Sequence, residues 1–364
     1  MKKYLLIIFL IIFCWGDQLA AQEIRSLERI KTIKWWALQS PGNPLKNKSL
    51  KLLSLIKVKG NRFVNSEGDT ILFRGLAIAD PDKLENEGQL NKDLFQRVKE
   101  MGATLVRIPV HPIAWRQRTP EKYLELLDQA IEWCTELHMY VIIDWHSIGN
   151  LKSGLFQDPM YITSLTETFD FWRTIARHFT GYNTVAFYEI FNEPTLYFGQ
   201  LGNMTWDEWK KINEDVIKLI RAFDKETIPL VAGFDWAYDL TPLRYDPIND
   251  EGIGYVTHPY PHKRTPPWEP KWEEDFGFAA GDYPVFATEL GFTLGNSSMN
   301  DNGDYGKTII NYLEKRGISW SWWVFDPQWE PKMFESWSDP TLTDNGRFFK
   351  ETVSGSSKQV KAEK

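Results

Sequence analysis

Eight short apolar runs recur along the chain, each separated from the next by room for a helix or a long crossover. The runs are rich in Val, Ile, Tyr and Phe and nearly continuous, as is typical of strands buried on both faces of a parallel sheet. They span residues 72–78, 104–110, 140–144, 185–191, 229–233, 254–258, 285–289 and 318–324.

Amphipathic stretches lie between these runs, at residues 93–101, 123–137, 165–179, 206–223 and 305–315. In the first of them, Leu94, Val98 and Met101 recur at helical spacing. Eight strands, each followed by a helix or crossover, predict an α/β chain folded as a (β/α)8 TIM barrel. An open doubly wound sheet is the weaker alternative, because no Gly-rich phosphate loop follows any run.

The N-terminus has the order of a signal peptide. Lys2 and Lys3 precede twelve apolar residues, and Ala20 and Ala21 offer a cleavage site near residue 21. The apolar run is shorter than the roughly 20 residues that a membrane span needs. We therefore expect residues 1–21 to be removed and the protein to be secreted or periplasmic; an uncleaved anchor and a lipid on Cys14 are the alternatives.

The remaining boundaries follow from composition. Residues 22–58 form a basic N-terminal extension, expected to be partly helical, and residues 59–353 form the catalytic barrel. Residues 62–64 and 71–73, around the polar turn 65–69, predict a β-hairpin at the start of the barrel. The Ser-, Gly- and Lys-rich residues 354–364 predict a disordered tail.

Charge and cysteine content exclude several classes of function. The net charge is -7, and it becomes -8 when Lys2, Lys3 and Asp17 are removed (−7 − 2 + 1). An acidic surface binds nucleic acid poorly. Only Cys134 would remain, so an intramolecular disulfide is impossible, and no Cys pair or H-x-H spacing suggests a metal. We expect a monomer with no cofactor, no metal and no membrane span.

Two glutamates end apolar runs, Glu193 after the fourth and Glu289 after the seventh. The carboxyl ends of barrel strands form the active-site face, so the two side chains can face each other across the barrel mouth. A retaining glycosidase needs two carboxyl groups about 5–5.5 Å apart. The sequence therefore predicts Glu193 and Glu289 as a catalytic pair.

Other strand ends carry groups that could orient these carboxylates or bind sugar. Arg107 could hold Glu289 ionised, His258 and Tyr260 could donate hydrogen bonds, and Asn192 could bind a sugar 2-hydroxyl. Each residue taken singly also fits a structural role. Their joint order at successive strand ends favours a functional site.

Aromatic residues make up 15% of the chain, including 17 Trp. Their flat faces suit either sugar rings or the core. Tryptophans near strand ends or in loops are Trp115, Trp145, Trp206, Trp236, Trp268, Trp323 and Trp329.

The strand ends together resemble clan A glycoside hydrolases, and most closely glycoside hydrolase family 5, the cellulase family. The resemblance covers about residues 60–352 and is carried by Phe73-Arg74-Gly75, Arg107-Ile108-Pro109, Asp144-Trp145-His146, Tyr188 to Pro194, Trp236, His258-Pro259-Tyr260, Glu289-Leu290-Gly291 and Trp323. It implies Glu193 as acid/base, Glu289 as nucleophile, and a substrate-binding shell of Arg107, His146, Asn192, Trp236, His258, Tyr260 and Trp323. The doubled Trp322-Trp323 leaves open which ring lines the subsite.

The resemblance implies a retaining hydrolase of β-linked polysaccharide, foremost an endo-β-1,4-glucanase acting by double displacement. A β-mannanase, a xyloglucanase and a β-1,3-glucan enzyme of the same family are alternatives. So is a non-catalytic sugar-binding barrel. A Schiff-base enzyme using Lys263 is a more distant alternative, because that lysine is expected to be solvated in a loop.

Overall fold

The structure, a computed structural model, describes residues 43, 45, 48, 50–195, 199–294, 300–301 and 305–362. The predicted signal peptide and most of the N-terminal extension lie outside these residues. From Asn43 onward the chain forms one compact unit. Among the described residues, none of the helices has the length and apolar character needed to cross a bilayer.

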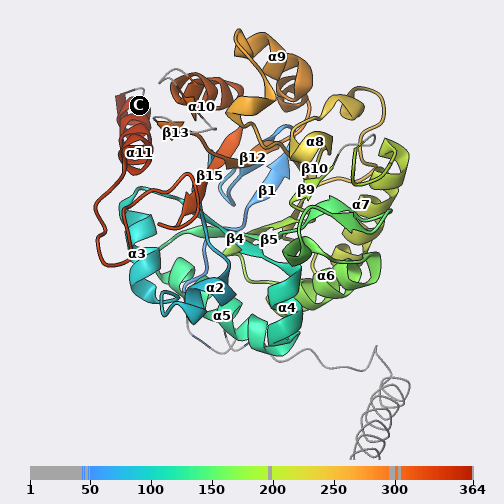
Figure 1. Ribbon diagram of the computed structural model, residues 1–364, viewed down its shortest axis with the longest axis horizontal. Helices are drawn as coiled ribbons and strands as arrows, with labels where there is room; N and C mark the ends of the chain where they lie inside the picture. The colour runs from blue at the N-terminus through green and yellow to red at the C-terminus, as the bar shows by residue number, and fades with distance from the viewer. Residues whose placement is uncertain are drawn as a thin grey trace, which may run out of the picture. The chain divides into compact units, whose positions relative to one another are not determined.

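Eight parallel strands close into a barrel, as the apolar runs predict (Figure 1). Each strand pairs with the next along the chain, and the last pairs with the first, with Trp320 opposite Arg74. The strands are β3 (Arg74–Ile78), β4 (Leu105–Val110), β5 (Tyr140–Trp145), β8 (Val185–Glu189), β10 (Ile228–Ala232), β11 (Gly254–Val256), β12 (Val285–Leu290) and β15 (Ser319–Phe325). All eight fall on predicted runs, so the (β/α)8 fold is confirmed.

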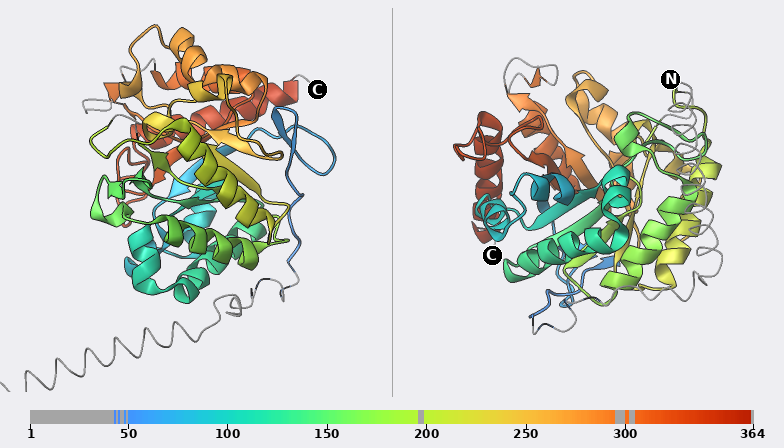
Figure 2. Two further views of the ribbon diagram at one scale, coloured as in Figure 1. Left: turned by 90° about the vertical axis from the view of Figure 1, so that its right-hand side faces the viewer. Right: turned by 60° about the horizontal axis from the view of Figure 1, so that its bottom comes forward.

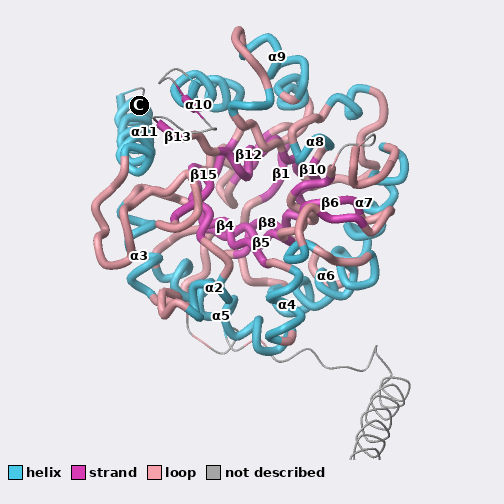
Figure 3. Tube along the Cα trace, viewed as in Figure 1, coloured by secondary structure: helices cyan, strands magenta, loops and turns pink. Residues whose placement is uncertain are grey.

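Helices surround the ring of strands (Figure 3). Their inward faces are apolar, and side-chain caps fix several starts; Thr205 and Glu208, for example, form a capping box at α7. The described helices are α2 (Pro81–Asn86), α3 (Lys92–Glu100), α4 (Pro112–Arg118), α5 (Pro120–Glu136), α6 (Leu165–Phe179), α7 (Trp206–Arg221), α8 (Phe234–Ala237), α9 (Trp268–Asp275), α10 (Tyr305–Arg316) and α11 (Asp344–Ala362). The five predicted helical stretches are all present.

The hairpin before the barrel differs from its prediction. The strand β2 (Arg62–Val64) pairs with β1 (Lys57–Lys59), which spans the predicted boundary between the extension and the barrel domain at residue 58. Gly60, at φ +59°, makes the tight turn between them in a conformation that favours glycine. The predicted pairing with residues 71–73 is reduced to one bridge, between Val64 and Thr70.

The C-terminal end also differs. Helix α11 runs through Ala362, across the segment for which the sequence predicts a disordered tail. Its first half is anchored, because Phe349 and Val353 are buried against the barrel. A helix that is nucleated by such packing propagates at little further cost, and composition alone does not register that nucleus.

Two small sheets follow the carboxyl ends of barrel strands. The strands β6 (Ile148–Asn150), β7 (Leu155–Phe156) and β9 (Glu193–Pro194) form one of them, and β13 (Thr293–Leu294) pairs with β14 (Asn300–Asp301) in another. Figure 2 shows the barrel and its surrounding helices from two further sides. In the first sheet, Ile148 pairs with Glu193, which ties the loop after β5 to the end of β8.

The amino ends of the barrel strands are closed by four phenylalanines. Phe63 from β2 meets Phe187 edge to face at 4.9 Å between ring centroids, and it lies 6.1–6.3 Å from Phe286 and Phe73. All four rings are buried. The hairpin β1–β2 thus plugs the barrel on the side away from the glutamates.

We expect Phe63→Ala to lower the free energy of unfolding by about 3–5 kcal/mol, the range for truncating a buried aromatic ring. Urea unfolding of the variant and the wild type measures the loss. Phe223→Ala, on a ring that is 37% exposed, is the matched control and should stay within about 1 kcal/mol. A loss for Phe63→Ala no larger than that of the control would mean that the ring does not plug the barrel.

Candidate active site

A buried arginine organises the carboxyl ends of the strands. Arg107 projects from β4 with no exposed surface. Its Nε and Nη2 donate to the two carboxylate oxygens of Glu189 at 2.8 and 2.9 Å, and Nη1 donates to Oε2 of Glu289 at 2.8 Å. Nη2 also donates to Oδ1 of Asn192 at 2.6 Å and lies 3.0 Å from Oδ2 of Asp144. One guanidinium on β4 therefore ties together groups from three other strands, β5, β8 and β12.

Glu189 is a site residue that the sequence analysis passed over. Burial alone would raise its pKa, but the charge of Arg107 and the hydrogen bonds from His258 and Arg107 outweigh burial and lower the pKa to about 2. Its signal was present in the sequence: an acid inside an apolar strand must have a buried partner. We read it only as part of the motif around Glu193.

The two predicted catalytic glutamates lie side by side over this network. One carboxylate oxygen of Glu193 and one of Glu289 lie within 4.8 Å of each other. The backbone N–H of Glu193 donates to the carbonyl of Ser147 at 3.0 Å, which fixes its place in the small sheet. Tyr260 donates its hydroxyl to Oε1 of Glu289 at 2.7 Å, so that carboxylate is held from both sides.

His258 links the two halves of the site. Its Nδ1 lies 3.0 Å from Oε1 of Glu193, and its Nε2 lies 3.0 Å from the hydroxyl of Thr288, which in turn donates to Glu189 at 2.9 Å. Burial would lower the pKa of His258, but its carboxylate partners raise it to about 9. The ring is therefore cationic at neutral pH and both nitrogens donate.

Glu193 sits in a different electrostatic environment from Glu189. Burial raises its pKa; the hydrogen bond from His258 opposes that shift, and the nearby charge of Glu289 adds to it, leaving the pKa above its usual value. Glu193, His258 and Glu289 could together offer three metal ligands. Both ring nitrogens of His258 are already hydrogen-bonded, to Glu193 and to Thr288, so neither is free to bind a metal ion in this arrangement.

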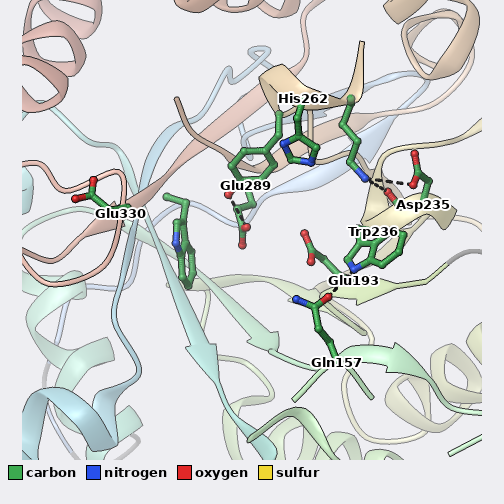
Figure 4. A pocket seen from close by; sticks show the side chains of 10 residues that line it. Gln157, Glu193, Asp235, Trp236, His262, Glu289 and Glu330 are labelled. Atoms are coloured by element: carbon green, nitrogen blue, oxygen red, sulfur yellow. Dashed lines mark hydrogen bonds and ion pairs between the residues drawn. The ribbon is translucent and has the colours of Figure 1, made fainter. Parts of the chain in front are cut away.

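A cavity of about 600 Å³ opens above the glutamates (Figure 4). Five of the predicted site residues line it: Glu193, Trp236, Tyr260, Glu289 and Trp323. The other four, Arg107, His146, Asn192 and His258, are buried behind these. The cavity wall also contains residues that we did not predict, namely Gln157, Asp235, His262, Lys263 and Glu330.

Two of the buried residues have groups suited to substrate. The amide nitrogen of Asn192 has no hydrogen-bond partner among the described residues, while its oxygen accepts from Arg107. His146 binds Oδ2 of Asp144 through Nδ1 at 2.6 Å and stacks on Trp323 at 5.1 Å between centroids. Burial and the neighbouring cationic groups lower the pKa of His146 well below its usual value, so the ring is neutral.

The tryptophans divide between core and site. Trp115 and Trp145 are buried in the core, as is Trp322, whereas Trp236 and Trp323 line the cavity and Trp329 stacks on Trp323 at 5.6 Å. The ring of the doubled pair that faces the cavity is therefore Trp323. Successive residues of a strand point to opposite sides, which explains the division between Trp322 and Trp323.

Lys263 is expected from the sequence to be solvated in a loop, but the structure places it elsewhere. It belongs to the short helix η5 (Pro261–Lys263), its side chain is only 9% exposed, and it lines the cavity. The reason is Asp235, which lies in the short segment α8, 28 residues earlier in the chain, and whose carboxylate is 3.3 Å from Nζ. Sequence distance conceals such a partner.

The pKa of His258 predicts a specific pH dependence of stability. Because it is raised from about 6.5 to about 9 in the folded protein, protonation stabilises the fold fully below pH 6.5, and that contribution is lost as pH rises through 9. We expect wild-type stability to fall in this window by up to about 1.4 kcal/mol per pH unit, and His258→Gln to lack that slope. Urea unfolding between pH 6 and 9.5 measures both; parallel curves would show that His258 has an ordinary pKa.

Comparison with known proteins agrees with this geometry. The family model for Cellulase (glycosyl hydrolase family 5) matches residues 64–328. An endoglucanase of Clostridium saccharobutylicum is 24% identical over 311 residues, covering 83% of this chain and 65% of the relative. Endoglucanase A of Butyrivibrio fibrisolvens is 24% identical and covers 77% and 62%. The chain thus spans less than two thirds of the length of these relatives.

Solved structures give a fuller match. A β-glucanase of Saccharophagus degradans, solved alone and with cellotetraose, has a TM-score of 0.84 and 44% identity, over 89% of this chain and 99% of that one. The catalytic domain of a Thermobifida fusca endoglucanase shares the fold at 20% identity, with a TM-score of 0.66 and coverage of 86% and 100%. With the family model spanning most of the barrel, the chain belongs to glycoside hydrolase family 5, the cellulase family.

Proposed function

We propose that this protein hydrolyses a β-linked glucan with net retention, using Glu289 as nucleophile and Glu193 as acid/base. The observation that carries the proposal is the separation of the two carboxylates, whose nearest oxygens lie within 4.8 Å. Retaining enzymes place their carboxyl groups about 5–5.5 Å apart, whereas inverting enzymes need roughly 6.5–9.5 Å to admit a water molecule.

The surroundings of each glutamate suit its role. Glu289 receives hydrogen bonds from Arg107 and Tyr260, which hold its carboxylate in a fixed position for attack on the anomeric carbon. Glu193 has a raised pKa, which favours the protonated form that a general acid needs. In the first step Glu193 protonates the glycosidic oxygen as Glu289 forms the glycosyl ester. In the second step Glu193 takes a proton from water, which displaces Glu289.

Neighbouring groups support both steps. Glu193 becomes an anion once it has given up its proton, and the cationic ring of His258, 3.0 Å away, then stabilises that charge. The amide N–H of Asn192 has no partner among the described residues although it is buried; in the proposed mechanism it donates to the sugar 2-hydroxyl of bound substrate, a contact that strengthens in an oxocarbenium-like transition state.

The substrate proposal rests on the cavity and on the relatives. Aromatic rings of Trp236 and Trp323 line the cavity, and such rings suit the apolar faces of glucose units. The 44% identical β-glucanase of Saccharophagus degradans was solved with cellotetraose, and the curated relatives are endoglucanases. We therefore infer endo-acting cleavage of β-1,4-glucan.

We expect the first products to keep the β configuration, because two successive displacements each invert the anomeric carbon. Proton NMR of early hydrolysis products from a soluble β-glucan measures this. α-Configured first products would overturn the mechanism. The absence of any hydrolysis, with the protein folded, would overturn the enzymatic function itself.

Azide rescue with a dinitrophenyl glycoside assigns the two roles. Glu193→Ala should still form the glycosyl-enzyme, because dinitrophenolate leaves unaided, and should then stall with a loss of roughly 10²–10⁴-fold. Azide needs no deprotonation, so it should restore turnover and give a β-glycosyl azide. Glu289→Ala should collapse for every substrate, and azide should yield the α-azide. The opposite pattern would mean that the two roles are reversed.

We also propose that the protein is exported, on the basis of the basic, apolar and small-residue order of residues 1–21. We expect the exported protein to begin near residue 22. Intact-mass spectrometry of the protein recovered outside the cytoplasm checks this, and an intact Met1 on that material would contradict it.

A further inference from the structure

The short segment α8, which carries Trp236, has an unusual backbone that is not that of a right-handed helix. Asp235, Trp236 and Ala237 have φ angles of +57°, +56° and +59°, three consecutive non-glycine residues in the left-handed region. L-residues with a Cβ disfavour this conformation, and a run of three persists only where surrounding contacts fix it. The orientation of the Trp236 ring therefore depends on what holds this segment.

Lys263 supplies the contacts on one side. Its Nζ donates to the backbone carbonyl of Asp235 at 2.6 Å and lies 3.3 Å from the Asp235 carboxylate. The same ammonium lies 5.1 Å from the centroid of the Trp236 ring, within reach of a cation–π interaction. A single buried cation thus holds the residue before Trp236 and one face of its indole.

Gln157 holds the ring from a different loop. The indole Nε1 of Trp236 donates to Oε1 of Gln157 at 2.8 Å, which links the loop after β10 to the segment after β7. In Figure 4, Trp236 lies on the Glu193 side of the cavity, and Glu330 lies beyond Glu289 on the other side. The acid that protonates the departing oxygen is therefore beside Trp236.

We propose that Lys263 is a positioning residue that fixes the Trp236 indole as a platform for the departing sugar. This inference rests on the proposed function, since it requires a sugar leaving group next to Glu193. With the ammonium over one face of the indole, the other face is the one available for a sugar ring. The role of Lys263 is indirect: it acts through Trp236, not on the reacting atoms.

The alternative is that Lys263 and Asp235 form a purely structural ion pair. Two substrates with different leaving groups distinguish this alternative from the positioning role. When cellotetraose is cleaved, the leaving group is a sugar, which can contact Trp236. When β-cellobiosyl fluoride is cleaved, the leaving group is fluoride, which cannot. We expect Lys263→Met to lower kcat/KM for cellotetraose by roughly tenfold, the size of one lost binding contact, and for the fluoride by less than about twofold. Lys218→Met, the same change at an exposed position of α7, is the matched control and should alter neither.

A double-mutant cycle completes the test. Trp236→Ala should show the same selective loss, and adding Lys263→Met to it should have no further effect on cellotetraose, because the ring to be positioned is gone. Lys263→Arg keeps the positive charge and the hydrogen-bond donors, so it should retain most of the wild-type kcat/KM for cellotetraose. If Lys263→Met folds poorly, the Arg variant is the one to compare with the wild type on both substrates.

Three results would overturn the inference while leaving the proposed function intact: equal losses on both substrates, additive losses in the cycle, or an Arg variant as impaired as Met. Wild-type protein that cleaves neither substrate would instead refute the proposed function, and the inference would fall with it.

Discussion

The buried guanidinium of Arg107 is the interaction on which the site depends. Inside a closed barrel no water reaches Glu189 or Asp144, and an unpaired carboxylate there would be strongly unfavourable. Arg107 contacts both of them and Glu289, so a single cation makes the burial of several acids possible. Burial and the nearby charges of Glu189 and Glu289 raise the pKa of Asp144 well above its usual value despite the opposing charge of Arg107, while burial lowers the pKa of its hydrogen-bond partner His146.

This arrangement shifts the pKa values of two neighbouring glutamates in opposite directions. Glu189, with two hydrogen bonds from Arg107 and one from Thr288, is held as an anion by a pKa of about 2. Glu193 does not contact the guanidinium and has a raised pKa. Environments that push the pKa values of neighbouring carboxyl groups apart are how one site can supply both an acid and an anion near neutral pH.

The walls and the floor of the cavity are held in place by different parts of the fold. The floor is built on strands, whose positions the barrel fixes, whereas the walls come from loops that must be fixed individually. Gln157, Trp236 and Lys263 hold three loops to one another by side-chain contacts. Trp323, which belongs to strand β15, also lines the cavity, and Trp329 stacks against it. In the function proposed above, walls fixed in this way orient a sugar chain without touching the reacting atoms.

The sequence by itself determined the barrel and the pair of glutamates. Continuous apolar runs with helical stretches between them admit few other folds, and the strand-end rule then brings Glu193 and Glu289 to one face. Only the tertiary structure decided the partners. Glu189 and Thr288 are 99 residues apart, Lys263 and Asp235 are 28 apart, and Phe63 and Phe187 are 124 apart (187 − 63), and no local pattern records these contacts. Periodicity reports which face of an element is buried, but a buried charge is paired by whatever the closed barrel brings within hydrogen-bond distance. The same limit explains the hairpin, whose partner strand was set by the turn at Gly60.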